Sequence, residues 1–159
     1  MTSTPNTAGS HDLSITRVID APRERVWQAW TDPEQLKQWF CPRPWRVTDC
    51  TIELHPGGRF HTTMAGPDGE EMPNPGVVLE VVPFERLVTT DAYIEAWKPA
   101  EKPFMTAIIE FEDLGGKTRY TATARHWNTD DRAAHEQMGF YDGWNTALDQ
   151  LIELVTSGS

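Results

Sequence analysis

The residues best suited to acid–base chemistry lie on either side of a predicted hairpin turn at Gly115-Gly116. If these glycines form a two-residue loop, Phe111 faces Tyr120 and Met105 faces His126 across the two strands. One face of the hairpin is then almost entirely apolar, and it carries the imidazole of His126 and the phenol of Tyr120. An imidazole in such a place could bind a ligand or act as a general base, and it could equally be a hydrogen-bonded core residue.

The other reactive residues lack the spacing that known metal and nucleophile sites require. Neither an HExxH nor a CxxC motif is present, and the adjacent His135 and Glu136 would point apart on a helix. Cys41 and Cys50 have no histidine nearby in the sequence, and there is no GxSxG motif. The residues considered as metal ligands and set aside on these grounds are His126, His135, Glu136 and Asp142. We expect no metal site and no cofactor.

Composition excludes several classes of protein. The chain has 159 residues, 38% of them apolar and 24% charged, which suits one soluble domain. No apolar run approaches the roughly 20 residues that a membrane helix needs. The net charge of -10, with scattered Arg and Lys residues, disfavours binding to nucleic acid or to an anionic membrane surface. Because no secretory signal is present, we expect Cys41 and Cys50 to be reduced thiols in the cytoplasm.

The first part of the chain is predicted to be a tail, a strand and two short helices. Residues 1–11 are rich in Thr, Ser, Asn and Gly and are expected to be disordered. Alternation over Leu13–Asp20 predicts a strand, and Pro22 and Asp32-Pro33 each begin a helix. The side chains expected to face inward from the two helices are Val26, Trp27, Trp30, Leu36, Trp39 and Phe40.

The middle of the chain is rich in β-branched and aromatic residues, and the end is helical. Between residues 45 and 125, turns containing Gly and Pro separate six predicted strands. Asn128 or Thr129 then caps a C-terminal helix of about six turns, long enough to span the sheet. Gly139 and Gly143 could permit a bend in it. The apolar stripe of this helix consists of Ala134, Met138, Tyr141, Trp144, Leu148, Leu151 and Val155.

This order of elements resembles the START-like superfamily, also called SRPBCC or helix-grip. The segments that carry the resemblance cover about Ile15 to Val155: APRERVWQAWTDPEQLKQWF, ELHPGGRF, GPDGEE, GVVLEVVPFERLV, FEDLGGKTRYTATARHW and HEQMGFYDGWNTALDQL. They are similar to the bacterial branch related to the C-terminal domain of the heat-shock protein 90 ATPase activator. The resemblance implies an α+β helix-grip fold over residues 12–156, with residues 157–159 as a second tail. A curved antiparallel sheet of about seven strands would be joined by two short helices after the first strand and by a long C-terminal helix over its concave face.

The resemblance also implies a cavity between the concave face of the sheet and the C-terminal helix. Alternation along the strands and the helix assigns the side chains that would line it, with three tryptophans closing its mouth. The residues expected to bind a ligand there are Trp39, Trp45, Phe60, Thr62, Met64, Leu79, Tyr93, Trp97, Met105, Ile109, Phe111, Met138, Tyr141 and Trp144. Such a wall favours a hydrophobic or aromatic small molecule, unless the aromatic residues simply fill the core.

Three functions fit these expectations. The first is a binding protein for a hydrophobic or aromatic small molecule. The second is a cyclase, dehydratase or hydrolase, a class that includes polyketide cyclases, in which His126 acts with Asp91 or Tyr120 as acid and base. Asp91 and His126 would then lie roughly 10 Å apart, two strands from each other. The third is a co-regulator of a chaperone ATPase, which we rank lowest because a single domain has no second domain to clamp a partner. The sequence leaves open whether the protein forms a homodimer.

Overall fold

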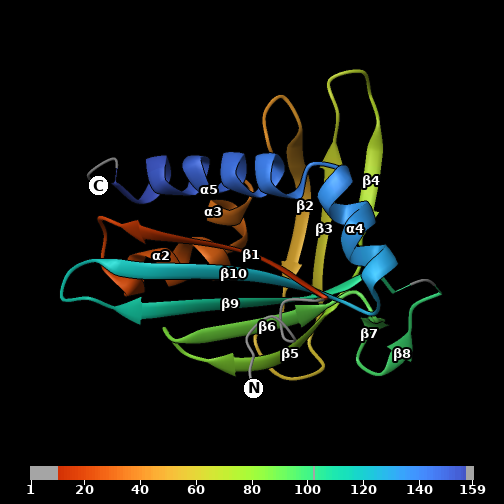
Figure 1. The fold of residues 1–159 in the computed structure, drawn as a ribbon, viewed down its shortest axis with the longest axis horizontal. Helices are drawn as coiled ribbons and strands as arrows, with labels where there is room; N and C mark the ends of the chain where they lie inside the picture. Colours follow the sequence, from red (N-terminus) through yellow and green to blue (C-terminus); the bar gives the residue numbers. More distant parts are fainter. Residues whose placement is uncertain (1–10, 102, 157–159) are drawn as a thin grey trace.

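The described chain runs through one strand, two short helices, nine further strands and two C-terminal helices (Figure 1). The computed structural model describes residues 11–101 and 103–156. The elements are β1 (Asp12–Ile19), α2 (Arg23–Thr31), α3 (Pro33–Leu36), β2 (Arg46–Ile52), β3 (Phe60–Ala65), β4 (Glu71–Asn74), β5 (Val77–Val82), β6 (Arg86–Thr90), β7 (Tyr93–Glu95), β8 (Lys98–Pro99), β9 (Met105–Asp113), β10 (Thr118–His126), α4 (Thr129–Gln137) and α5 (Phe140–Thr156). Apart from His11, the tails predicted at 1–11 and 157–159 lie outside the described residues.

The β9–β10 hairpin has the predicted register. Phe111 lies opposite Tyr120, and Met105 lies opposite His126. The two residues of Gly115-Gly116 have φ angles of 78° and 91°. A type I′ turn requires positive φ at both central positions, which glycine adopts without steric cost. The hairpin prediction is therefore confirmed, and one face of it does gather the aromatic and imidazole side chains.

The strands form a five-stranded antiparallel sheet in the order β1-β10-β9-β6-β5 and a three-stranded sheet in the order β2-β3-β4. The two sheets meet where Arg59 pairs with Val77, next to a hydrogen bond from the Phe60 N–H to the Gly76 carbonyl. The sequence predicted one curved sheet of about seven strands. The fold class is confirmed, but the described residues contain more and shorter strands, because Pro75 and Gly76 separate β4 from β5 and a small β7–β8 hairpin is inserted after β6.

A bulge in β5 changes which of its side chains reach the core. The pairing between β5 and β6 shifts between Val78 and Glu80. Val78 consequently belongs to the hydrophobic core cluster, with Val81 packed at its edge. Leu79, which simple alternation placed inward, is not part of this cluster. That expectation is wrong because a bulge adds one residue to the strand and breaks its period of two.

Regular pairing of β6 with β9 ends at Thr90, and the side chain of Asp91 bonds the backbone just beyond this point. One carboxylate oxygen of Asp91 accepts the backbone N–H groups of Phe104, at 2.8 Å, and Met105, at 3.1 Å. The segment between these residues then forms the β7–β8 hairpin. Tyr93, which alternation placed on the inward face of the preceding strand, lies instead in β7.

The two short helices begin where the sequence predicts. Pro22 precedes α2, and Asp32 caps α3 by accepting a hydrogen bond from the N–H of Glu34. The buried side chains of the two helices and of the loop after them are Val26, Trp27, Ala29, Trp30, Leu36 and Trp39. They join β1, β9, β10 and α5 in one core cluster. The inward positions predicted for these helices are confirmed, with Phe40 partly buried at the edge of the cluster.

The C-terminal helix is divided at Gly139, whose φ of 101° cannot continue a right-handed helix. Figure 1 shows α4 turned away from the axis of α5. Asn128, one of the two predicted caps, begins α4 by accepting the N–H of Asp131. The break shifts the helical phase, so Met138 and Tyr141 are 74% and 41% exposed. Their predicted inward orientation is wrong because it assumed one continuous helix.

From position 144 onward the predicted apolar stripe is correct, and α5 packs on the sheet as the helix-grip fold requires. Arg17 of β1 donates hydrogen bonds to Asp149 at 2.8 Å and to Asn145 at 3.0 Å, which fixes α5 to the edge of the sheet. The buried apolar side chains of α5 are Phe140, Ala147, Leu148, Leu151 and Val155. Within the described residues, no helix has the length and apolar character needed to cross a membrane.

Candidate ligand-binding cavity

A cavity of about 310 Å³ lies between the sheets and α5, within the size range of small-molecule sites. Its wall takes residues from β1, α2, the loop after α3, β3, β4, β6, β9, β10 and α5. The predicted site residues that lie in this wall are Trp39, Phe60, Thr62, Met64, Asp91, Met105, Tyr120 and Trp144. The fold therefore brings together side chains from both ends of the chain around one internal space.

The other predicted ligand-binding residues lie outside this wall. They are Trp45, Leu79, Tyr93, Trp97, Ile109, Phe111, Met138 and Tyr141. Ile109 and Phe111 fill the core, where Phe111 packs edge-on against Trp27 with ring centroids 5.4 Å apart. Tyr93 and Trp97 pack against each other beside the β7–β8 turn, and Trp97 is 62% exposed. Alternation and aromatic character selected these side chains, but neither property distinguishes a residue that fills the core from one that lines a cavity.

His126, the predicted general base, is buried but does not line the cavity. Its Nδ1 donates to the backbone carbonyl of His11 at 2.9 Å, and its Nε2 lies 2.8 Å from Nδ1 of His135. Both ring nitrogens of His126 are therefore engaged in hydrogen bonds. Burial, and secondly the positive charge of His126 when protonated, lower the pKa of His135 to about 4. In the described part of the chain, no three His, Cys, Asp or Glu side chains gather closely enough to hold a metal ion.

Tyr120 places a hydroxyl group in the cavity wall. Its oxygen accepts the Nε1–H of Trp30 at 3.0 Å, and the residue is only 3% exposed. Burial raises the pKa of the phenol well above its ordinary value, so the group stays protonated at neutral pH and can donate a hydrogen bond. The hydroxyl hydrogen has no acceptor within residues 11–101 and 103–156. This arrangement leaves one buried donor for a molecule inside the cavity.

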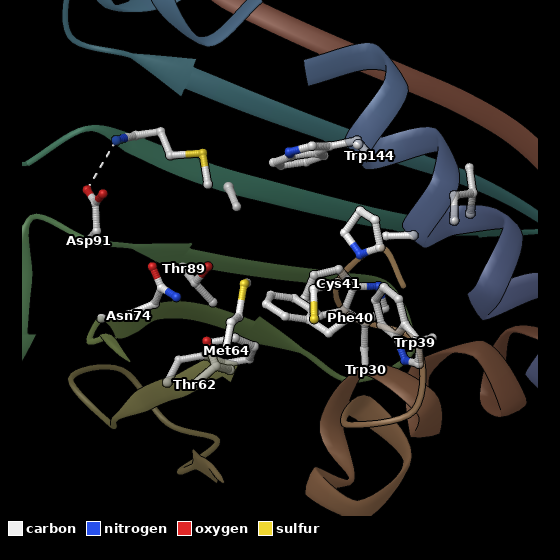
Figure 2. A pocket seen from close by; sticks show the side chains of 18 of the residues that line it. Trp30, Trp39, Phe40, Cys41, Thr62, Met64, Asn74, Thr89, Asp91 and Trp144 are labelled. Atoms are coloured by element: carbon white, nitrogen blue, oxygen red, sulfur yellow. Dashed lines mark hydrogen bonds between the residues drawn. The ribbon is translucent and has the colours of Figure 1, made fainter. Parts of the chain in front are cut away.

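Thr62 supplies a second hydroxyl to the wall. The residue is 3% exposed, and its side chain forms no hydrogen bond with any other residue that the structure describes. Among the described residues, Arg23 Nε is the buried side-chain polar atom without a hydrogen-bond partner, so the Thr62 hydroxyl is not fully enclosed. A ligand or a water molecule in the cavity can therefore hydrogen-bond to it. Thr62 lies beside Met64 in the view of Figure 2. Polar groups of this kind fix the orientation of a ligand that apolar walls hold.

The two ends of the cavity differ in chemistry, as Figure 2 shows. Trp30, Trp39 and Phe40 gather at one end, with the rings of Trp30 and Trp39 edge-on at 5.1 Å. The polar side chains at the other end are Asn74, Thr89 and Asp91. An elongated molecule with one apolar and one polar end matches this division.

Gln150 holds the loop that supplies the aromatic end. Its Nε2 donates to the backbone carbonyls of Trp39, at 3.0 Å, and Cys41, at 2.8 Å. Its Oε1 accepts the N–H of Arg43 at 3.1 Å. A buried amide with three hydrogen bonds fixes the loop firmly against α5. Burial also raises the pKa of the Cys41 thiol, which disfavours the reactive thiolate.

Comparison with known proteins identifies the family. The family model described as activator of Hsp90 ATPase homolog 1-like protein matches residues 20–156. The chain belongs to this family. A search of curated proteins gives no match.

Several solved structures have the same fold as this chain. The chain is similar to protein NE0264 from Nitrosomonas europaea, with 43% identity, a TM-score of 0.90, and coverage of 93% of this chain and 96% of that one. For protein Ms6760 from Mycobacterium smegmatis, the identity is 28%, the TM-score 0.79 and the coverage 96% and 94%. An AHSA1-like protein from Aeromonas hydrophila has 25% identity, a TM-score of 0.72 and coverage of 92% of both chains.

Sequence reasoning did not single out several wall residues of this AHSA1-like domain as ligand-binding. They are Ile15, Trp30, Phe40, Cys41, Pro42, Asn74, Pro75, Gly76, Thr90, Gly143, Ala147 and Leu148. One signal was available, because Gly143 and Ala147 are small residues one helical turn apart. A Cβ atom built on Gly143 would have no heavy atom within 4 Å, apart from its chain neighbours and the nearby backbone of its own helix. Small residues on this face of α5 thus leave room for the cavity.

Proposed function

We propose that the protein is a cytosolic binding protein for a hydrophobic or aromatic small molecule, held between the sheets and α5. The observation that carries this proposal is Tyr120, whose buried hydroxyl donor lacks an acceptor among the described residues, in a wall that also carries several aromatic rings. A ligand with a carbonyl, ether or hydroxyl oxygen would supply that acceptor while its apolar body packs against the rings. The free thiols of Cys41 and Cys50 fit a reducing compartment.

Binding has more support than acid–base catalysis. The hypothesis of a cyclase, dehydratase or hydrolase needs His126 to face the substrate together with Asp91 or Tyr120. His126 lies outside the cavity wall with both ring nitrogens in hydrogen bonds. One oxygen of Asp91 holds two backbone N–H groups, and burial keeps Tyr120 protonated. These contacts suit a recognition site better than a proton-transfer site.

Fluorescence titration with the neutral probe N-phenyl-1-naphthylamine tests the proposal. We expect saturable binding with enhanced emission. Gly143→Leu would extend a side chain into the cavity and, because leucine favours a helix over glycine, should not unfold α5. We expect this variant to weaken binding by about tenfold or more. Thr146→Leu introduces the same side chain on an exposed position of α5 and should bind as the parent protein does. No saturable binding, or equal binding by Gly143→Leu, would contradict the proposal.

A further inference from the structure

Among the residues that the structure describes, the cavity wall contains one charged side chain, and its sign restricts the proposed ligand. Among the described wall residues, Asp91 is the only Asp, Glu, Lys, Arg or His. The chain as a whole carries a net charge of -10. A ligand carboxylate inside the cavity would therefore face a like charge, and the described part of the wall has no cationic side chain to balance it. The field of the protein also attracts cations and repels anions at long range.

The geometry of Asp91 leaves one carboxylate oxygen available. Oδ1 accepts the N–H groups of Phe104 and Met105, which fixes the carboxylate at the polar end of the cavity (Figure 2). Oδ2 has no hydrogen-bond or ion-pair partner among the described residues. An anchored carboxylate with one unused oxygen is pre-organised to accept a hydrogen bond from a bound molecule.

Two neighbouring side chains at this end also present acceptors. Asn74 donates its Nδ2 to the Met72 carbonyl at 3.1 Å, which leaves its Oδ1 without a partner within the described chain. The Thr89 hydroxyl likewise makes no hydrogen bond with the residues that the structure describes. The oxygens of Asp91, Asn74 and Thr89 together match the three N–H donors of an ammonium group, which has no acceptor of its own.

We infer that the cavity selects a cationic aromatic amine over a carboxylate of the same shape. The ammonium group lies at Asp91, Asn74 and Thr89, and the aromatic body lies toward Trp30 and Trp39 at the opposite end. This inference rests on the proposed binding function and adds the charge class of the ligand. It also makes fatty acids, which carry a carboxylate on an apolar chain, poor ligands for this cavity.

A series of three naphthalene compounds that differ mainly in charge tests the inference. They are 2-(1-naphthyl)ethylamine, 2-(1-naphthyl)ethanol and 1-naphthylacetate, titrated at pH 7 and followed by tryptophan quenching. We expect the amine to bind about tenfold or more tighter than the acetate, with the alcohol between them. In Asp91→Asn, the side-chain oxygen still accepts the Phe104 and Met105 N–H groups, but the charge is gone. We expect this variant to bind the amine and the acetate within about threefold of each other and the alcohol as before.

Two controls separate the inference from the proposed function. Glu24→Gln removes the same charge from an exposed position of α2 and should leave the tenfold preference unchanged. Gly143→Leu should weaken binding of all three compounds, which locates them in the cavity. If the alcohol binds but the acetate binds as tightly as the amine, or if the preference survives Asp91→Asn, the charge inference is wrong. If no compound binds and N-phenyl-1-naphthylamine also fails, the proposed function is wrong.

Discussion

His126 and His135 share a buried hydrogen bond of 2.8 Å, from Nδ1 of His135 to Nε2 of His126, which joins β10 to α4. The direction follows from the carbonyl of His11, which requires the hydrogen of His126 to be on Nδ1 and so makes Nε2 the acceptor in the neutral pair. Aromatic rings enclose the pair: Phe104 lies 5.0 Å and Phe140 lies 5.1 Å from the ring of His135. Protonation of His135 would place a positive charge among these apolar groups.

Because of the buried histidine pair, we expect the free energy of unfolding to decrease in mild acid. The pKa of His135 is about 4 in the folded protein, compared with about 6.5 for an exposed histidine. Between these values the unfolded chain binds more protons than the folded chain, so the free energy of unfolding falls as the pH decreases from 6.5 toward 4. Above pH 6.5 the stabilising contribution is complete. Thermal unfolding followed by circular dichroism should show a lower Tm at each step in this range.

A histidine-specific measurement separates this effect from the titration of carboxylates. In an NMR titration, the ring protons of His135 should change with a midpoint near pH 4, and a midpoint near 6.5 would contradict the assignment. His135→Gln retains a side-chain N–H for His126 Nε2 but cannot be protonated. The dependence of Tm on pH between about 6.5 and 4 should therefore be weaker in this variant than in the parent protein.

The hydrogen bond between Trp30 and Tyr120 should contribute measurably to stability. Tyr120→Phe leaves the indole N–H of Trp30 without an acceptor in a buried site, which costs about 1–3 kcal/mol. Trp30→Phe removes the donor and also part of a packed ring. The double variant tests the pair, because the loss from Tyr120→Phe should be smaller when Trp30 is already phenylalanine. A double-mutant cycle from urea unfolding should give a coupling energy of about 1 kcal/mol, and strict additivity would contradict the bond.

Gln150 should be essential to the loop that forms the aromatic end of the cavity. Gln150→Leu keeps a similar volume but leaves the carbonyls of Trp39 and Cys41 and the N–H of Arg43 without this partner. We expect a loss of about 2–3 kcal/mol in the free energy of unfolding, together with weaker binding of N-phenyl-1-naphthylamine. Thr146→Leu, on the exposed side of α5, serves as the matched control and should change neither quantity appreciably. Unchanged stability of Gln150→Leu would show that the loop is held by its other contacts.

The helix break predicts opposite outcomes for two apolar residues of similar size. Leu151 of α5 is fully buried, whereas Met138, between the two helices, is 74% exposed. Leu151→Ala should lower the free energy of unfolding by about 2–5 kcal/mol, and Met138→Ala should change it by less than about 0.5 kcal/mol. Urea unfolding of the two variants compares them directly. Under the continuous helix expected from the sequence, both substitutions would have been costly.

Local signals explain the parts of the fold that could be predicted. The turn at Gly115-Gly116 has the glycines that a type I′ loop needs, and the flanking strands alternate regularly, so the register follows from the sequence alone. The caps at Asp32 and Asn128 are equally local, since each side chain bonds an N–H two or three residues away. The glycine at 139 indicated that a bend was allowed, but neither the positive φ that it adopts nor the bulge at Leu79 has a comparable local signal, because each depends on the packing of distant elements.

The candidate site was predictable only in part for the same physical reason. Phe60, Thr62, Met64 and Met105 lie on regular strands, so alternation found them correctly in the cavity wall. Gln150 and Trp39 are 111 positions apart and meet only after α5 has packed on the loop. His126 was placed on the inward face, but its partner His135 is buried only because α4 has a different phase from α5. Contacts between distant side chains of this kind leave no periodic pattern in the sequence.

The glycine at position 139 divides the end of the chain into two helices, which we expect to unfold as separate units. α4 has one buried side chain, His135, whereas α5 has six. Helical hydrogen bonding does not run without interruption through a residue with φ of 101°, so opening of α4 does not require opening of α5. We therefore expect amide hydrogens of α4 to exchange with solvent through a local opening that breaks the histidine pair, and those of α5 to exchange only when the core itself opens. As the pH falls below about 6.5, opening of α4 should become easier before opening of α5 does.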